Sequence, residues 1–371
     1  MKQQVKDDII IADLIDEIGV IQMKKQLIIP ESSVYDNLKR SAKEYGSLCA
    51  VDYFGREISY RELIREVNRC ACALIAIGVN RGDVVSVCLP NVPQAVYMLY
   101  AINKLGAVAD MIDPYSSEKD IRERLIKSGS RYLFALESIS EKLENVISSA
   151  DIKLAVTAAV SDEMPIVMKT GHLIKNFGKK KQKSSFMDWN GFISKASPTD
   201  RYISAHSTGE TTAAYVSEED NSQSICVSNN NFNDFAMYCL EECGNIDKAD
   251  RVLAVLPVSH GFGIGTCIHS VFSVGGTAVI LPNFNNNDID KAIIRYCPNV
   301  IAGDSRMYKA LADSSGLDGK DISFIKTAIM TGSGFEDTLK KDIRELLRAN
   351  GSVCSICRIV SLTEYIGKNQ E

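Results

Sequence analysis

The sequence lacks a long uninterrupted apolar segment. Nowhere in its 371 residues do about 18 apolar residues follow one another, so we expect no transmembrane helix. The opening segment, Asp7 to Glu17, mixes acidic with apolar residues and has neither the cationic start nor the small-residue cleavage site of a secretory signal. We therefore expect residues 1–32 to form an amphipathic helical lead and the protein to be cytoplasmic.

An excess of basic residues is also missing, since 42 Lys and Arg stand against 47 Asp and Glu and the formal net charge is −5. Without a continuous basic face, nucleic acid is not expected as a partner. The short basic run at 179–183 is either a solvated loop or a small patch for an anionic partner.

The eleven cysteines are an odd number and do not form a disulfide framework. Cys70, Cys72 and Cys88 lie in apolar periodic stretches, so we expect reduced thiols in the core. Cys354 and Cys357 form a CxxC in a predicted strand, where an offset of three residues places the two thiols on opposite faces. A second ligand pair is also missing, so a zinc site is not expected there.

Apolar runs of strand length alternate with helical periodicity, which favours parallel sheets covered by helices. We predict strands at 84–89, 108–112, 131–136, 251–258, 277–281, 299–302 and 326–330, and helices at 61–78, 93–105, 119–127 and 335–349. The pattern weakens between Pro165 and Thr199. The predicted fold class is α/β, with a first subdomain at 33–190 and a second at 191–371.

Small polar residues gather in the turn that follows Tyr202–Ala205. Ser207, Thr208, Gly209, Thr211 and Thr212 bring hydroxyls and backbone amides together, and such groups can converge on a phosphate. The segment has a single glycine and no GxxxxGK[ST] pattern. An ordinary serine–threonine turn therefore remains an alternative.

The segment Leu256 to Gly265 ends a buried-type strand in glycines and carries His260. Ligands of open parallel sheets bind beyond the carboxyl ends of strands, so His260 is placed for a pocket. A dinucleotide site does not fit, because the spacing is GxGxG and the next strand is not followed by an acidic residue. A purely structural histidine remains an alternative.

Two more strand exits carry small or polar residues. Gly332, Ser333 and Gly334 follow one predicted strand, and Thr363 with Glu364 follows the strand that ends at Val360. Each group is placed at the expected ligand edge, and each could equally be a plain turn.

In this order the segments resemble the AMP-binding acyl-CoA synthetase (acid–CoA ligase) family, from about Ser33 to the end. The likeness is most specific away from the candidate site, in the segments Ile58–Leu63, Gly78–Val85, Leu89–Gln94, Lys104–Val108 and Asp113–Pro114. The resemblance implies the large N-terminal domain of these enzymes, with two stacked, mostly parallel, helix-covered sheets.

The resemblance also implies a chemistry, in which ATP and a carboxylic acid give an acyl-adenylate that coenzyme A converts to a thioester. Residues 207–215 stand where the family has its TSGTTGxPKG phosphate loop. His260 matches the LPxxHxxG segment beside the acid, and Gly332, Ser333 and Gly334 match the adenine loop. Thr363 and Glu364 match the pair that meets the α-phosphate and Mg²⁺, with Glu364 as the metal ligand.

The loop departs from the family pattern at Glu210, Thr212, Ala214 and Tyr215, which replace a hydroxyl residue, a glycine, a proline and a lysine. Family members continue beyond the Thr-Glu pair with a ribose-binding Asp, a hinge and a small domain that carries a lysine. We expect the chain as written to form acyl-adenylates poorly, and a separate chain to supply that domain.

The acid is expected to be fatty or aryl. Two alternatives remain: an amino-acid adenylation module, which normally has an Asp where Val258 to His260 offer none, and a non-catalytic scaffold for nucleotide or acyl ligands.

Overall fold

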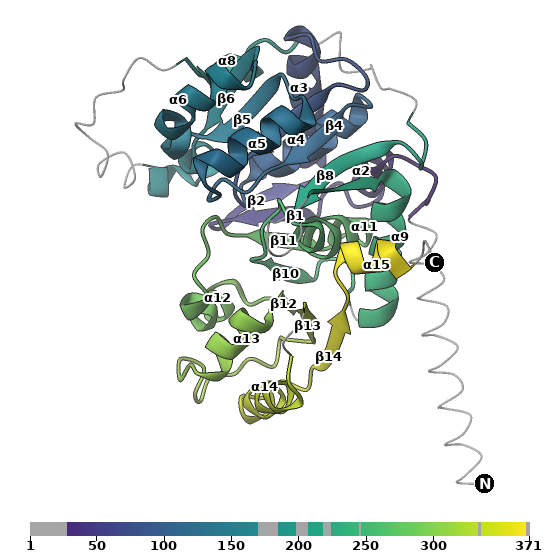
Figure 1. The fold of residues 1–371 in the computed structure, drawn as a ribbon. Helices are drawn as coiled ribbons and strands as arrows, with labels where there is room; N and C mark the ends of the chain where they lie inside the picture. The colour runs from purple at the N-terminus through teal and green to yellow at the C-terminus, as the bar shows by residue number, and fades with distance from the viewer. Residues whose placement is uncertain are drawn as a thin grey trace.

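The computed structural model describes residues 28–169, 185–197, 207–217, 224–244, 246–332 and 335–368. Within them, two seven-stranded sheets lie one above the other, with helices between them and on their outer faces (Figure 1). The predicted fold class is therefore confirmed. The predicted lead at 1–27 and the basic run at 179–183 lie outside the described residues.

The first sheet, at the top of Figure 1, has the order β7-β6-β5-β3-β4-β8-β9 and is parallel except for the pair β8 and β9. In that order its strands are Met187–Asp188, Leu154–Ala158, Tyr132–Leu136, Val84–Cys88, Val108–Met111, Thr212–Ser217 and Ser224–Ser228. Helices α5 (Glu118–Ser128) and α6 (Ser140–Ser149) cover its outer face, where Leu125, Leu133 and Leu143 pack together.

The second sheet has the order β14-β13-β12-β10-β11-β1-β2, and only β1 and β2 pair in antiparallel fashion. In that order its strands are Ser355–Ile359, Thr327–Thr331, Val300–Asp304, Arg251–Ala254, Thr277–Ile280, Cys49–Tyr53 and Arg56–Ser59. Three helices pack on its outer face: α12 (Ile289–Tyr296), α13 (Ser305–Ala312) and α14 (Asp337–Ala349).

The main core lies between the two sheets and contains residues from both. Its central element is α4 (Pro93–Lys104), every residue of which is buried. Pro93 suits the first helical position, where the missing N–H has no partner to lose. Helices α2 (Val34–Glu44) and α3 (Tyr60–Ala76) pack directly on α4. The same core contains residues of α8 (Trp189–Ile193), α9 (Asn229–Cys243), α10 (Gly261–Ile264), α11 (Ser270–Ser273) and α15 (Leu362–Lys368), and of the π-helical turn Gly265–His269 between α10 and α11.

The predicted strands and helices are present with shifts of a few residues at their ends, the largest at 251–258, where β10 already ends at Ala254. The two sheets, however, do not follow the division into 33–190 and 191–371. Strands β1 and β2 belong to the second sheet, and β8 and β9 complete the first. That division stays a prediction for the domains and does not describe the sheets.

The cysteines behave as the sequence predicts. Cys70, Cys72 and Cys88 are buried, and no disulfide forms within the described residues. Cys354 packs against the outer cluster of the second sheet, whereas Cys357 packs against the core between the sheets. The two thiols of the CxxC therefore lie on opposite faces.

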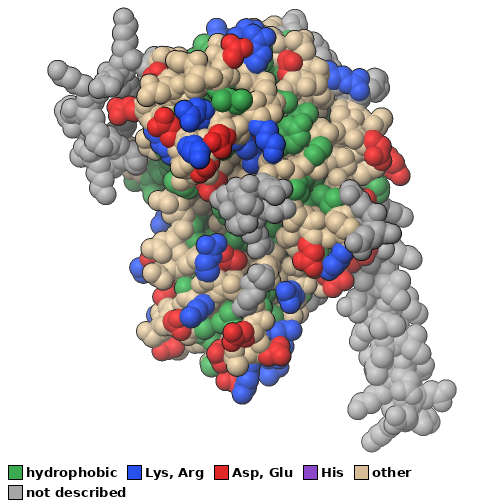
Figure 2. Space-filling view, in the orientation of Figure 1, with side chains coloured by type: hydrophobic (Ala, Val, Ile, Leu, Met, Phe, Trp, Pro, Cys, Tyr) green, Lys and Arg blue, Asp and Glu red, His purple; other side chains and the backbone are tan. Residues whose placement is uncertain are grey.

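Among the described residues, no helix is both long and apolar enough to span a membrane. On the face that Figure 2 shows, basic and acidic side chains of the described residues are interspersed.

Candidate nucleotide and acid site

The polar turn at 207–211 is closed by its own hydroxyl groups. The Thr211 amide donates to the Thr208 carbonyl at 3.1 Å, and the Thr208 amide donates to Thr211 Oγ1 at 3.2 Å. Thr212 is already the first residue of β8, and its hydroxyl lies 3.3 Å from Cys226 Sγ on β9. The turn thus presents Ser207 to Thr211, while Thr212 faces the neighbouring strand.

The first residues of α9 hold this turn in place. Asn229 Nδ2 donates to the carbonyl oxygens of Thr208 (2.9 Å) and Thr211 (3.2 Å), and the Asn230 amide donates to the Gly209 carbonyl at 2.8 Å. A Cβ at Gly209 would overlap the side-chain amide of Asn230. The glycine is therefore explained by this close approach.

Asn229 also ties the turn to the core. Its Oδ1 accepts from the Val34 amide at 3.0 Å and from Asn103 Nδ2 at 2.8 Å, so the fully buried amide is satisfied on both sides. Sequence reasoning missed Asn229, because its partners are brought together only by the fold. Its place directly after β9 and beside the turn was the available indication.

His260 lies where the two sheets meet. The Ser217 amide, at the end of β8, donates to the Ser259 carbonyl at 2.9 Å, and Ser217 forms an isolated parallel bridge with His260. Arg124 Nη1 donates to Ser217 Oγ at 2.9 Å, and Arg124 Nε donates to the buried Asp110 carboxylate at 2.7 Å. A buried ion pair thus supports the junction beside His260.

The ring of His260 is largely withdrawn from water and lies among charges of both signs. Burial lowers the pKa of His260, and Asp113 opposes this effect. Arg306, Arg124 and Asp304 also act on the ring. These charges come from the carboxyl ends of β4 and β12, from α5 and from α13, so the ring lies among charges of both sheets. Because burial lowers its pKa, His260 is neutral near pH 7.

Thr363 and Glu364 lie in the first turn of α15. Thr363 Oγ1 is 2.7 Å from Ser361 Oγ, and the exposed Glu364 carboxylate accepts from Lys368 Nζ at 2.8 Å. The preceding residue, Leu362, packs on Gly261, where an added Cβ would come 2.9 Å from the Leu362 side chain. This contact places the start of α15 beside the His260 segment.

Helix α9 connects the polar turn with α15. Its first residues bind the turn, and further along it the ring of Tyr238 stacks on Tyr365 of α15 with centroids 4.9 Å apart. The phosphate-loop candidates and the Thr-Glu candidates therefore pack on the same helix, the former at its start and the latter near Tyr238.

Gly332, directly after β13, has a φ of 87°, and its carbonyl accepts from Arg358 Nη2 at 3.2 Å. Ser333 and Gly334 lie outside the described residues. Within the described residues, the buried hydroxyls of Ser207, Ser259 and Thr331 have no hydrogen-bond partner. Buried polar groups are normally satisfied, so each of these three is suited to donate to a ligand or water. Ser259 and Thr331 follow strands of the second sheet, whereas Ser207 precedes β8, at the opposite end of that strand from Ser217 and His260.

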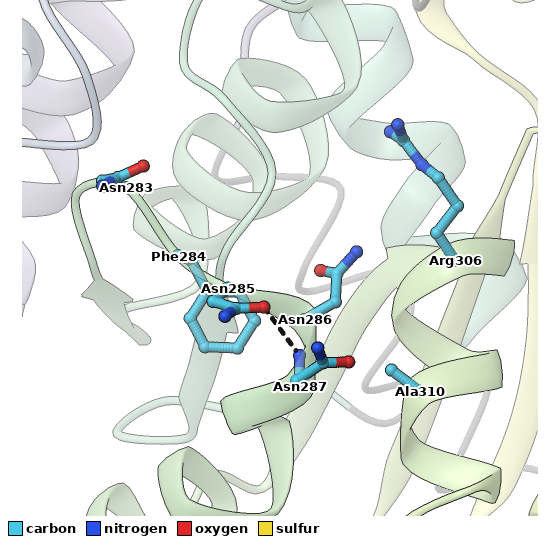
Figure 3. Close-up of a pocket in the computed structure, with 7 residues that line it drawn as sticks. All are labelled: Asn283, Phe284, Asn285, Asn286, Asn287, Arg306 and Ala310. Atoms are coloured by element: carbon cyan, nitrogen blue, oxygen red, sulfur yellow. Dashed lines mark hydrogen bonds between the residues drawn. The ribbon is translucent and has the colours of Figure 1, made fainter.

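An open hollow of about 640 Å³ lies near this edge but does not include the candidate residues. Figure 3 shows four asparagines and Phe284, from the segment after β11, on one side and Arg306 and Ala310, from α13, on the other. Arg306 pairs with Asp304 at 2.6 Å and is the one member of this lining that also acts on His260. Within the described residues, no group of three or more His, Cys, Asp or Glu side chains could hold a metal by itself.

A sequence model of the family described as "AMP-binding enzyme" matches residues 38–216 and 223–367. The chain belongs to this AMP-binding enzyme family. It is 21% identical to a long-chain-fatty-acid–CoA ligase of Bacillus subtilis (strain 168) over 340 residues. The aligned region covers 86% of this chain and 59% of that protein. The family that the sequence resembles is thereby confirmed.

Solved structures of family members have the same fold as this chain. The anthranilate CoA ligase AuaEII, in complex with anthranoyl-AMP, superposes with a TM-score of 0.75 at 17% identity over 92% of this chain and 61% of that one. ATP-bound MatB from Rhodopseudomonas palustris superposes with a TM-score of 0.72 at 15% identity, covering 90% of this chain and 60% of that one. The chain thus spans about three fifths of the proteins that it resembles.

Proposed function

We propose that this chain provides the nucleotide- and acid-binding part of an adenylate-forming acid–CoA ligase. In this reaction a carboxylate oxygen attacks the α-phosphorus of ATP and pyrophosphate leaves; the thiol of coenzyme A then attacks the acyl carbon and AMP leaves. The first step needs positioned donors more than a protein nucleophile. The observation that carries the proposal is that the buried hydroxyls of Ser259, beyond β10, and Thr331, at the end of β13, have no hydrogen-bond partner within the described residues. Ser207 offers a third such hydroxyl in the polar turn.

Each candidate residue takes the role that its family counterpart implies. Ser207, Thr208, Gly209 and Thr211 bind phosphate oxygens through hydroxyls and backbone amides, and Gly332, with Ser333 and Gly334, lies against adenine. His260, held neutral by burial, contacts the carboxylic acid. Thr363 meets the α-phosphate.

Mg²⁺ fits this arrangement through Glu364. The ion favours one or two carboxylates together with water and phosphate oxygens rather than a cage of protein ligands. Glu364 is an exposed carboxylate with Lys368 as its partner, so it can turn to a metal when the lysine releases it. When bound, the ion would neutralise phosphate charge.

The class of acid substrate and the cellular location are parts of the same proposal. A fatty or an aryl acid is favoured, since the relatives include a long-chain-fatty-acid ligase and an anthranilate ligase. Cysteines without disulfides are typical of a reducing compartment, which supports a cytoplasmic location.

Calorimetric titration of MgATP into residues 1–371 tests nucleotide binding. We expect Thr208→Ala and Thr211→Val to weaken MgATP binding about tenfold or more, since a hydrogen bond to a charged group contributes about 1.5–3 kcal/mol. Thr338→Val is the matched control, because Thr338 is exposed at the start of α14 on the far side of the second sheet. Equal affinity of the parent and both turn variants for MgATP would refute the phosphate role.

The acid half has its own titration. Adding anthranilate or decanoate should tighten AMP binding in the parent and not in His260→Ala. If neither acid changes AMP affinity in the parent, the proposed acid site is wrong.

One observation favours a second function, a nucleotide-binding scaffold without catalysis. Glu210 places a carboxylate in the phosphate turn, where its Oε1 accepts from Asn230 Nδ2 at 2.8 Å. This like charge opposes a triphosphate more than a monophosphate. A protein that binds AMP tightly and MgATP weakly would favour the scaffold.

A further inference from the structure

Two cysteines that the proposed reaction does not use face each other where α9 packs on β14. Cys243 is the last residue of α9 and Cys357 lies in the middle of β14, 114 residues further along the chain. Their sulfur atoms are 2.6 Å apart, close to the S–S bond of about 2.05 Å in a disulfide. The two elements pack directly on each other, so little backbone movement is needed to join them.

We propose that Cys243 and Cys357 form a reversible disulfide on exposure to a peroxide, and that this bond is a redox modification site that locks α9 to β14. The proposal does not depend on the proposed ligase function. Two other pairings are disfavoured by geometry: Cys354 lies on the opposite face of β14, and Cys239 has Thr266 Oγ1 as its partner at 3.3 Å.

Hydrogen peroxide is the oxidant, and the half-buried Cys357 meets it first, since Cys243 is only 4% exposed. The hydrogen bond with Cys357 and then burial raise the pKa of the Cys243 thiol, so Cys243 is poorly suited to react first. Cys357 Sγ attacks one peroxide oxygen, the O–O bond breaks, and the products are a sulfenic acid and water.

Cys243 completes the reaction. Its sulfur attacks Cys357 Sγ, the S–S bond forms and the S–O bond breaks. The hydroxide that leaves takes up the proton of the Cys243 thiol and becomes a second water. In sum, two thiols lose two electrons and two protons, and one peroxide is reduced to two waters.

The position of the bond gives it a structural consequence. The first residues of α9 hold the polar turn at Thr208 and Thr211, and β14 leads into α15 with Thr363. A bond between Cys243 and Cys357 would fix the distance between these two segments. Reduction by a dithiol would release it.

The test treats native residues 1–371 with hydrogen peroxide, blocks remaining thiols with N-ethylmaleimide, and maps peptides without reduction. We expect a Cys243–Cys357 linked peptide, a loss of two titratable thiols from eleven, and recovery of both with dithiothreitol. Cys354→Ser, changed three residues away on the opposite face, should keep the link, and Cys357→Ser should lose it.

Hydrogen exchange gives a second measurement that does not depend on any variant. The amides of α9 and β14 should exchange more slowly in the oxidised parent than in the reduced parent. A Cys357 found as sulfinic or sulfonic acid without the linked peptide, or a Cys354–Cys357 link in its place, would overturn the proposal.

Discussion

Asn91 and Val258 are joined by a hydrogen bond between the two halves of the fold, in which the Val258 amide donates to Asn91 Oδ1 at 2.9 Å. Asn91 Nδ2 in turn donates to the carbonyl oxygens of Ala254 (3.1 Å) and Leu256 (3.0 Å). A single buried amide thus fixes the backbone on the way to His260. Its segment, Leu89 to Gln94, carries part of the family resemblance, and the structure gives a physical reason for it.

The first prediction concerns this amide. Asn91→Ala leaves the buried Val258 amide without its acceptor, and an unsatisfied buried group costs about 1–3 kcal/mol. We expect urea unfolding to show that the free energy of unfolding falls by about 1–3 kcal/mol. Asn287→Ala, at an exposed position in the segment after β11, should change it by less than about 0.5 kcal/mol. Similar effects of the two changes would contradict the bridging role.

The second prediction concerns the charge of the polar turn. Glu210 and Tyr215 differ by two charge units from the family pattern, and one unit charge at about 5 Å is worth roughly 3 kcal/mol at an effective dielectric of about 20. Glu210→Thr with Tyr215→Lys should therefore tighten MgATP binding at least tenfold, or about 1.4 kcal/mol.

Calorimetric titration of MgATP and AMP against parent and double variant checks this. AMP carries fewer phosphates and should gain much less. Because Tyr215 lies within β8, four residues past the turn, the result also decides whether its side chain faces the phosphates. Unchanged MgATP affinity would remove Tyr215 from the site.

The sequence was sufficient for the elements but not for their assembly. Strands such as β13 are apolar runs bounded by polar residues, and their type and place follow from that pattern alone. The local pattern does not predict that the β1–β2 hairpin joins the second sheet and the β8–β9 hairpin the first. Strand β1 lies parallel to β11 with Val51 opposite Ala278, more than 200 residues away. Such pairing depends on long-range packing that no local pattern records.

The same limit applies to the candidate site. A strand exit located His260, because ligands gather at the carboxyl ends of parallel strands. The polar turn was found by its cluster of hydroxyl residues, and the structure places it at the amino end of β8, whereas His260 lies beside Ser217 at the other end of that strand. The supporting amides of Asn91 and Asn229 were not identified as such, since their partners come from α2, α4 and the second sheet. Their role depends on contacts between distant segments.

The third prediction concerns His269, which lies in the π-helical turn of the core. Its Nδ1 is 3.1 Å from Tyr100 Oη, and its Nε2 is 2.9 Å from Asn233 Oδ1. Asn233 Nδ2 donates to the carbonyl oxygens of Ile29, Pro30 and Ser32, which assigns Oδ1 as the acceptor and puts the histidine proton on Nε2. The ring is neutral in the folded protein.

Burial lowers the pKa of His269 from 6.5 to about 4 in the folded protein. Between these values the unfolded chain binds the proton and the folded one does not, so stability is complete above about pH 6.5 and falls as the pH drops toward 4. A shift of this size is worth about 3 kcal/mol. Urea unfolding from pH 7 to pH 4.5 should therefore show a smaller loss of stability in His269→Gln than in the parent. Parallel pH curves would contradict the buried neutral ring.

The fourth prediction concerns the contact between Gly261 and Leu362, which seats α15 beside His260. A Cβ added at Gly261 would come 2.9 Å from Leu362 Cβ and Cδ2, closer than packed carbon atoms approach. Overpacking of this kind costs about 1–3 kcal/mol. Gly261→Ala should lower the free energy of unfolding by that amount and speed hydrogen exchange in α15, which carries Thr363 and Glu364.

A second change distinguishes this steric contact from a loss of backbone freedom at Gly261. Leu362→Gly removes both clashing atoms, so the double variant Gly261→Ala with Leu362→Gly should be no less stable than Leu362→Gly alone. The coupling free energy between the two positions should then be about 1–3 kcal/mol, as for residues in direct contact. If the two destabilisations simply add, Gly261 is needed for its own backbone, and the seating of α15 against the His260 segment does not depend on this pair.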